Sequence, residues 1–227
     1  MKTIVLTVFV VATLWLAACG GGGSASQNNP TPPPGPSPSP QPYLPLKVGN
    51  TWTYACYKGT PSPGASAFPK TNQVIGSTTV GGTLTYEYQE QLPTSATTST
   101  TQIQLLANDA KGNTIIYGYM ANPTASPVAV TPTVIIPHNP GVPLNSFYDY
   151  PAEGGGTVPR VYCCTGATNP TVFGVFTVNE FFDGSHTLSA TSDGYGYALG
   201  QGSMEEDHNS NKTSPRIDCI ITATPPP

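Results

Sequence analysis

Charged residues are scarce in this chain. Its 227 residues include 8 Lys and Arg against 12 Asp and Glu, so the formal net charge is −4 and only 9% of the residues are charged. Nucleic acid requires clustered positive charge, and electrostatic attachment to an anionic membrane requires a polybasic segment. The composition therefore argues against a nucleic-acid partner and against a polybasic contribution to membrane binding.

Known catalytic motifs are also missing. The sequence contains no GxSxG, HExxH, P-loop or EF-hand pattern. Of its three histidines, His138 lies between prolines in a predicted loop and His186 follows a predicted hairpin turn. We expect no enzymatic activity, no cofactor and no metal site. A cell-envelope hydrolase is the alternative if His138 and His186 converge with Asp149 or Asp183 in the folded chain.

The third histidine, His208, belongs to the acidic stretch MEEDHNSNK. Carboxylates beside an imidazole could bind a divalent ion or carry out acid–base chemistry. On a strand, however, Glu205 and Asp207 would share one face while Glu206 and His208 shared the other. The four groups would not converge, and we expect a solvent-exposed charged turn.

One apolar run stands out, from Ile4 to Ala18. It is shorter than the ~20 residues that a helix needs to span a bilayer. A positive start, an apolar core and small residues before a cleavage point define a secretory signal peptide, which we place at residues 1–18. The sequence Leu-Ala-Ala-Cys that ends at Cys19 resembles the bacterial lipobox. Cys19 is therefore the predicted lipidation site, with palmitate among its expected acyl chains.

The residues after Cys19 indicate where the protein is attached. In the sorting rule for bacterial lipoproteins, Asp after the lipidated Cys retains the protein in the inner membrane; Gly20 stands there instead and indicates the outer membrane. The expected membrane partner acts through the lipid on Cys19. Residues 19–42 are rich in Gly, Ser and Pro, which predicts a disordered linker. The globular domain is expected at 43–224, followed by a tail at 225–227.

A periodicity of two dominates the domain. Trp52, Tyr54 and Cys56 alternate with Thr and Ala, which places the three larger side chains on one face of a strand. Gly81 and Gly82 fit a two-residue hairpin turn, and 108–113 fits a longer one. We predict an all-β domain: an antiparallel sheet, arranged as a sandwich or a half-barrel and solvated on one face.

The same alternation predicts the other strands. In one of them Leu84, Tyr86 and Tyr88 are expected on a common face, and the glycines of Gly194–Gly200 are expected to permit a bulge or a close strand contact. Beyond the strands around 51–56, 83–88, 102–105 and 115–119, we expect strands at 132–136, 158–164, 171–182, 186–190, 194–199 and 216–223.

Four cysteines remain once Cys19 is set aside: Cys56, Cys163, Cys164 and Cys219. An even number in an exported chain indicates disulfides. Because adjacent side chains of a strand point to opposite faces, a bond between Cys163 and Cys164 is disfavoured. We therefore predict that Cys56 pairs with one of these neighbours and Cys219 with the other. The alternative of metal binding lacks a CxxC or CxxxH spacing.

The opening of the domain, YLPLKVGNTWTY from Tyr43 to Tyr54, is its most specific stretch. It resembles a group of bacterial lipoproteins that begin aromatic-x-Pro-Leu-x-x-Gly-Asn-x-Trp-x-Tyr. Members often end near a YAPGVGLV stretch, to which Tyr197–Met204 is similar, with Leu199 in place of Pro and Met204 in place of Val. The resemblance implies a secreted, β-rich lipoprotein and implies no particular reaction.

These features predict a lipid-anchored envelope protein whose β-rich domain binds an unknown ligand or has a structural role. Tyrosines on the sheet could contact an apolar or a glycan ligand, although Tyr in strands also serves in packing. The alternatives are the hydrolase and a carrier of an apolar ligand in a hydrophobic cavity.

Overall fold

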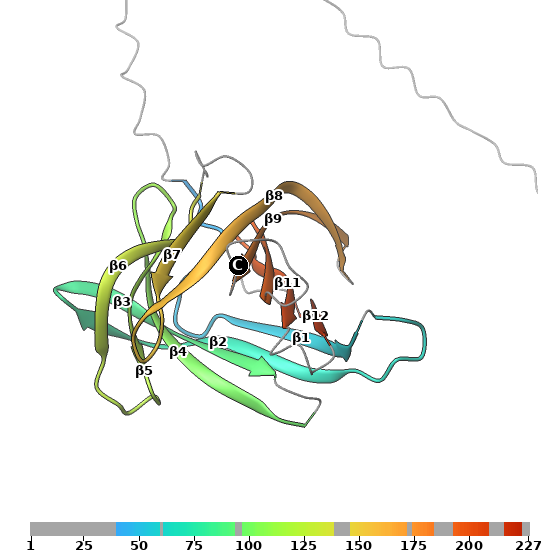
Figure 1. Cartoon of the computed structure of the whole chain (residues 1–227), viewed down its shortest axis with the longest axis horizontal. Coiled ribbons are helices and arrows are strands. Elements are labelled where there is room, and N and C mark those ends of the chain that lie inside the picture. The colour runs from blue at the N-terminus through green and yellow to red at the C-terminus, as the bar shows by residue number, and fades with distance from the viewer. Residues whose placement is uncertain are drawn as a thin grey trace, which may run out of the picture. The chain divides into compact units, whose positions relative to one another are not determined.

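The computed structural model describes residues 40–59, 61–93, 97–138, 146–171, 174–183, 193–208 and 216–223. These residues form twelve strands (Figure 1). No helix in these segments is long and apolar enough to cross a membrane. The strands are β1 (Thr51–Lys58), β2 (Phe68–Val80), β3 (Thr83–Pro93), β4 (Ser99–Asn108), β5 (Thr114–Met120), β6 (Val128–Ile136), β7 (Phe147–Pro151), β8 (Thr157–Thr171), β9 (Gly174–Asp183), β10 (Asp193–Ala198), β11 (Gly202–His208) and β12 (Ile217–Ile221).

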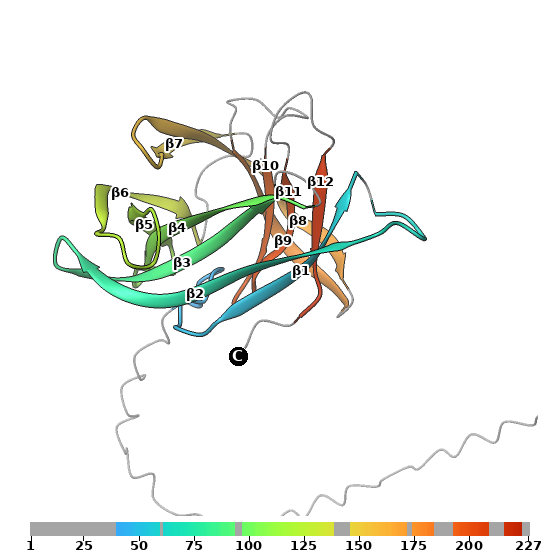
Figure 2. The same ribbon diagram turned by 90° about the horizontal axis from the view of Figure 1, so that it is seen from below.

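All twelve strands belong to one antiparallel sheet. Its order is β6-β5-β4-β3-β2-β1-β12-β11-β10-β9-β8-β7, so the first and last strands of the chain are neighbours in its middle. Figures 1 and 2 show the sheet curling around an interior until its two edge strands, β6 and β7, approach each other. The prediction of an all-β antiparallel domain is confirmed, and the arrangement is a nearly closed barrel rather than a sandwich.

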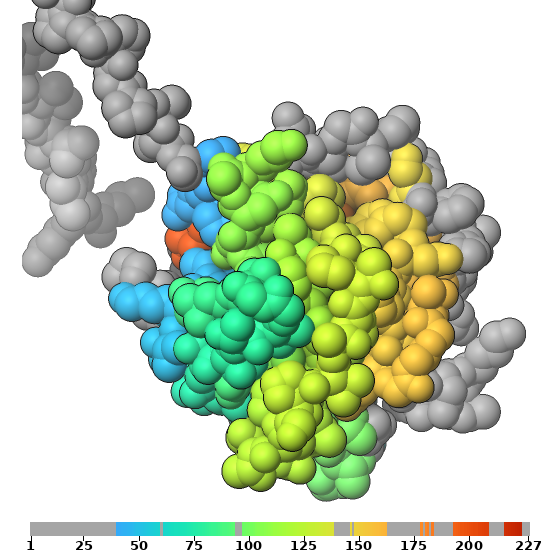
Figure 3. Space-filling model, turned by 90° about the vertical axis from the view of Figure 1, so that its left-hand side faces the viewer, coloured from blue at the N-terminus to red at the C-terminus, as the bar shows by residue number. Residues whose placement is uncertain are grey.

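Side chains bridge the seam between the two edge strands. The Tyr148 hydroxyl and the Arg160 Nη1 each donate to the Ile135 carbonyl oxygen at 2.8 Å. Near the other end of β6, the Tyr119 hydroxyl donates to the Pro151 carbonyl oxygen at 2.6 Å. In the space-filling view, β6 lies beside β7 and the start of β8 (Figure 3). These bonds satisfy backbone acceptors at edges that would otherwise be open to solvent or to another strand.

Alternation along β1 builds the centre of the core. Trp52, Tyr54 and Cys56 are fully buried on the inner face, which confirms the prediction for this strand. The prediction for β3 is only partly correct. Tyr88 is buried and Tyr86 packs against the core, but Leu84 is 56% exposed because it lies at the end of β3 beside the turn.

The two predicted hairpin turns are present. Gly81 and Gly82 join β2 to β3 with φ of +57° and +85°, a conformation that glycine adopts without steric cost. Between β4 and β5, the Asp109 carboxylate accepts hydrogen bonds from the backbone N–H groups of Lys111 and Asn113. A bulge between Gly196 and Tyr197 matches the expectation for the glycine-rich segment.

Three strands were not predicted: β2, β7 and β11. Their inner positions carry polar or charged side chains, or prolines interrupt them, so the hydrophobic alternation that marks a strand is weak. The predicted strand at 186–190 lies outside the described residues.

The predicted disulfide pairing is wrong. Cys56 is bonded to Cys219, with Cα atoms 4.0 Å apart, because these two residues lie directly opposite each other on the adjacent strands β1 and β12. The prediction assumed that Cys163 and Cys164 would each bond to one of the other two cysteines. The sequence gives no sign that the first and last strands pair. Cys163 and Cys164 lie on β8, and their side chains are outside the described part of the structure.

The two segments that carry the family resemblance pack against each other. The Trp52 indole donates to the Gln201 carbonyl oxygen at 2.6 Å, and the Tyr54 hydroxyl donates to the Ser203 carbonyl oxygen at 3.1 Å. Gly202 between them has a φ of +89°, and a Cβ atom there would lie 2.4 Å from the Trp52 Nε1. The segment before β1 adds a hydrogen bond from the Gly202 N–H to the Tyr43 carbonyl oxygen. Residues of the opening motif thus hold the start of the domain against the β10–β11 turn and the first residues of β11.

Candidate binding site inside the sheet

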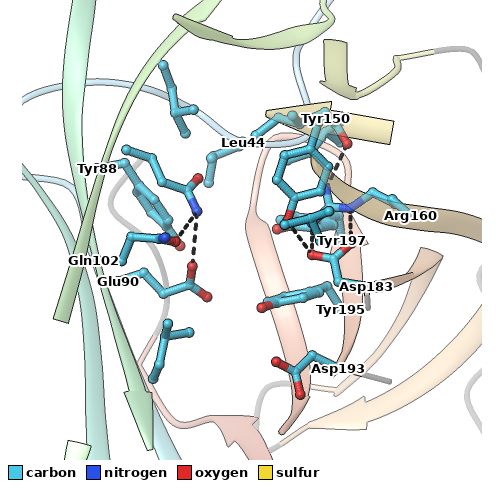
Figure 4. Close-up of a pocket in the computed structure, with 16 residues that line it drawn as sticks. Leu44, Tyr88, Glu90, Gln102, Tyr150, Arg160, Asp183, Asp193, Tyr195 and Tyr197 are labelled. Carbon is cyan, nitrogen blue, oxygen red and sulfur yellow. Dashed lines mark hydrogen bonds and ion pairs between the residues drawn. The ribbon is translucent and has the colours of Figure 1, made fainter. Parts of the chain in front are cut away.

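The interior of the curled sheet contains a cavity of about 320 Å³. It lies between β3 and β4 on one side and β7 to β10 on the other, and Figure 4 shows the two groups of side chains facing each other across open space. Tyrosines, carboxyl groups, amides and one arginine form most of the lining, and aliphatic side chains complete it. The lining residues are Leu44, Tyr88, Glu90, Leu92, Gln102, Gln104, Leu106, Ile135, Ile136, Tyr150, Val158, Arg160, Asp183, Asp193, Tyr195 and Tyr197.

One wall of the cavity carries an amide ladder that ends at a carboxyl group. Alternation along β4 turns Gln102 and Gln104 inward, and Glu90 comes from the neighbouring strand β3. The Gln104 Nε2 donates to the Gln102 Oε1 at 3.0 Å and lies 3.4 Å from the Glu90 Oε2. The Glu90 side chain is 6% exposed. This wall therefore presents both hydrogen-bond donors and acceptors to the cavity.

The opposite wall is built around a buried ion pair. Arg160 on β8 binds both carboxylate oxygens of Asp183 on β9, through Nε and through Nη2. The Tyr150 hydroxyl donates to the Asp183 Oδ2 at 2.8 Å. Although burial opposes the charged form of Arg160, the Asp183 carboxylate and Tyr150 raise the pKa of the guanidinium well above its usual value. The Arg160 guanidinium therefore stays charged inside the sheet.

Tyrosine rings cover this wall. Tyr195 and Tyr197 on β10 stack with ring centroids 6.3 Å apart, and the Arg160 guanidinium lies over the rings of Tyr150 and Tyr195 at 4.9 and 5.5 Å. Burial raises the pKa of each of these phenols well above the ordinary value, so all remain protonated donors. Asp193 begins β10 and also lines the cavity.

Beside the amide wall, on the same inner face of the sheet, lies a second polar network, centred on Lys70 of β2. Its Nζ forms an ion pair with the Glu206 Oε2, lies 2.9 Å from the His208 Nε2, and is 3.9 Å from the Glu90 Oε1. The Asn72 Nδ2 donates to the Glu206 Oε1 at 2.9 Å. All of these side chains are buried, so the network is held within the core rather than at the surface.

This network corrects the expectation for the acidic stretch. Residues 202–208 form strand β11 and not a solvent-exposed turn. Alternation does separate the side chains as expected, but the Glu206 and His208 face turns into the core, where Lys70 compensates their polarity. The partner of Glu206 and His208 is Lys70 on β2, and the sequence around residues 204–212 contains no sign of it.

The two inner glutamates have opposite titration behaviour. Burial and the neighbouring carboxylates outweigh the attraction of Lys70 and raise the pKa of Glu90 to about 8. For Glu206 burial acts in the same direction, but Lys70 and His208 dominate and lower its pKa to about 2. Burial and the Lys70 charge lower the pKa of His208. At neutral pH Glu206 is therefore ionised, whereas most Glu90 side chains carry a proton.

The outward residues of β11 belong to a different cluster. Asp207 lies opposite Asp218 of β12, and Arg216 forms ion pairs with both. Burial and the nearby Asp207 raise the pKa of Asp218 to about 6, and burial raises that of Glu205 to about 7. In the described part of the chain, no group of three or more His, Cys, Asp or Glu is arranged to bind a metal ion.

Among the described residues, those that a hydrolase would need do not converge. The His138 ring lies 5.9 Å from the ring of Tyr43, outside the group that lines the cavity, and Asp149 is exposed. Asp183 does reach the cavity, but it is engaged by Arg160. His186 is outside the described residues, as is the predicted lipidation site Cys19.

Sequence reasoning missed most of the cavity. Arg160, Glu90 and Gln104 are charged or polar residues at inward positions, and a single sequence places such residues on the solvent-facing side of a strand. One available signal was the sequence Val158-x-Arg160-x-Tyr162, in which a charged residue stands between two large apolar residues of the same face.

Comparisons with known proteins give a likeness of structure at low identity. No family model and no curated protein matches the sequence. A crystal structure from Bacteroides fragilis, described as an exported protein with a YmcC-like fold, is 12% identical and aligns over 81% of this chain and 99% of its own, with a TM-score of 0.45. A protein from Parabacteroides distasonis described as a lipoprotein is also 12% identical, over 81% and 98%, with a TM-score of 0.36.

Proposed function

We propose that this protein is a lipid-anchored component of the bacterial cell envelope that binds a small hydroxyl-rich ligand, such as a short glycan, inside its curled sheet. The lipobox at Cys19 supports the anchor, and Gly20 favours the outer membrane. The observation that carries the binding function is the cavity of about 320 Å³ between an amide wall and a tyrosine wall.

The polarity of the interior supports binding over a purely structural role. Buried ion pairs such as Arg160–Asp183 are costly to desolvate, and well-packed apolar residues of similar volume often give equal or greater stability. An interior that retains ion pairs, amides and phenols around a cavity therefore favours selection for ligand contacts.

The chemistry of the lining favours a hydroxyl-rich ligand over an apolar one. Side-chain amides such as Gln102 both donate and accept hydrogen bonds, as sugar hydroxyls do, and a tyrosine combines an apolar ring with a polar tip. An apolar ligand would instead remove Glu90 and the amides from water without replacing their hydrogen bonds, at a cost of about 1–3 kcal/mol for each group. A carrier of apolar ligands is the weaker hypothesis for this reason.

The test is a glycan array of bacterial polysaccharide fragments, probed with the full chain in detergent. The critical variant is Gln102→Leu in the cavity, and the matched control is Gln89→Leu, which alternation places on the outer face of β3 beside Glu90. We expect the wild type to retain specific glycans, Gln102→Leu to lose about tenfold or more in affinity, and Gln89→Leu to behave as the wild type. No retained glycan, or equal losses in both variants, would contradict the proposal.

A further inference from the structure

We propose that the ligand of this cavity carries a positively charged amino group, as a de-N-acetylated amino sugar does, and that Glu90 receives this group. The inference rests on the proposed function and specifies its ligand class. It follows from the commitment of Arg160 to other partners, from the incomplete pairing of Glu90 and from the aromatic lining.

Carboxyl groups outnumber cations among the described residues that line the cavity. Within that set, Glu90, Asp183 and Asp193 contribute three carboxyl groups, and Arg160 is the one basic side chain. Arg160 is matched by both oxygens of Asp183 and by the Ile135 carbonyl oxygen. Arg160 is therefore committed to partners other than Glu90, and it leaves that carboxyl group for a cation of the ligand.

Glu90 is the carboxyl group whose partners leave room for such a charge. Its contact with Gln104 is long, at 3.4 Å, and its distance of 3.9 Å from the Lys70 Nζ exceeds that of a hydrogen bond. Lys70 itself is committed to Glu206 and His208. A buried carboxyl group held this loosely gains most from a new charge-assisted hydrogen bond.

The groups that act on Glu90 come from five other strands. Lys70 approaches from β2 and Gln104 from β4, while Arg160 on β8, Asp183 on β9 and the Glu206–His208 side of β11 act from further away. Burial, Glu206 and Asp183 raise the pKa of Glu90 to about 8, against Lys70 and Arg160. In the free protein at pH 7, most Glu90 side chains are thus protonated. An arriving ammonium group would stabilise the carboxylate, and the Glu90 proton would leave to solvent.

The tyrosines supply the second feature that suits a cation. Aromatic faces attract cations within about 6 Å of the ring centroid. The chain already uses this interaction in the cavity, where the Arg160 guanidinium lies over Tyr150 and Tyr195. Tyr88 and Tyr197 line the same space, and Tyr88 lies on the strand that carries Glu90.

Calorimetric titration of the full chain in detergent with glucosamine, glucose and N-acetylglucosamine tests the inference. We expect glucosamine to bind about tenfold or more tightly than the other two sugars at pH 7, because charge-assisted hydrogen bonds exceed neutral ones in strength. Repeating the titration in buffers of different protonation enthalpy should reveal release of a substantial fraction of a proton for each glucosamine bound.

Two isosteric variants assign the effect. Glu90→Gln reproduces the uncharged side chain of the free protein, so it should fold, bind the three sugars alike and release no proton. Glu87→Gln, on the outer face of the same strand, should retain the preference for glucosamine. Equal binding of glucose and glucosamine by the wild type would overturn the inference but leave the proposed glycan binding standing. Glucosamine that fails to bind, or that prefers Glu90→Gln, would also overturn it.

Discussion

At the scale of single residues, the molecule depends on contacts between side chains and backbone that are far apart in sequence. Trp52 donates a hydrogen bond to the β10–β11 turn and Tyr54 donates one to the start of β11, each to a residue 149 positions away. The Gly202 Cα faces the edge of the Trp52 indole so closely that no Cβ atom fits. The Trp of the opening motif and this Gly near the end of the domain therefore depend on each other.

The first prediction compares two glycines of similar backbone conformation. Gly202 has a φ of +89° and a Cβ atom there would meet Trp52, whereas Gly154 has a φ of +80° and a Cβ atom there would have nothing within 4 Å. Gly202→Ala should lower the free energy of unfolding by about 2–4 kcal/mol through backbone strain and overpacking together. Gly154→Ala should cost only about 1 kcal/mol, from backbone strain alone. Urea denaturation measures both, and equal losses would show that the Trp52 contact is not tight.

The second prediction concerns pH. In the folded chain the pKa of Glu90 is about 8, against 4.5 as its ordinary value, so between these two limits the folded state binds more protons than the unfolded state. Stability therefore falls as pH rises from about 4.5 to 8. Glu90→Gln should remove this contribution and be more stable than the wild type at pH 8 by about 2–4 kcal/mol.

Urea denaturation at pH 5 and pH 8 checks this, with Glu87→Gln as the control that should follow the wild type.

Glu206 affects the pH dependence of stability in the opposite sense, because its pKa is lowered to about 2. Its contribution is complete above about pH 4.5 and is lost as the pH falls towards 2. A Glu90→Gln variant whose stability falls between pH 5 and 8 as steeply as that of the wild type would contradict the raised pKa of Glu90.

At the scale of strands, alternation predicted the strands that carry large apolar residues on one face, and it missed β2 and β11, whose inner faces carry polar and charged side chains. The strands β1 and β4 follow the expected alternation because one face of each carries large apolar side chains. In β2 and β11 the inner positions hold Lys70, Asn72, Glu206 and His208, which read as surface residues in a single sequence. A buried charge is recognisable only with its partner, and these partners lie on different strands.

The pairing of β1 with β12 shows a second limit. Which strands become neighbours depends on how the whole sheet closes, and no local pattern near Cys56 or Cys219 contains that information. The predicted export of the chain correctly indicated a disulfide, but the choice of partners required the strand order.

The third prediction follows from this strand pairing. Peptide mapping of the unreduced protein should recover Cys56 linked to Cys219. Replacing both residues by Ala should lower the free energy of unfolding by about 2–5 kcal/mol, because the bond closes a long loop of the unfolded chain. Recovery of Cys56 or Cys219 bonded to a peptide of β8 would contradict the fold at its central strands.

At the scale of the whole molecule, a curled sheet with a polar interior is joined to a predicted lipid anchor by a linker rich in Gly, Ser and Pro. The fourth prediction tests the anchor. Cys19→Ser should abolish incorporation of labelled fatty acid and move the protein out of the membrane fraction, because the lipid is the expected attachment. Labelled fatty acid on the Cys19→Ser protein would refute the lipobox assignment.

The central claim is that ligands bind inside the sheet. The most direct measurement is an NMR titration of the full chain, in detergent and with labelled tyrosine, using a glycan retained on the array. The account predicts saturable shifts for the cavity residues Tyr195 and Tyr197 and none for Tyr57, which alternation places on the outer face of β1. Shifts confined to Tyr57 and other outer tyrosines, with the cavity rings unchanged, would contradict it.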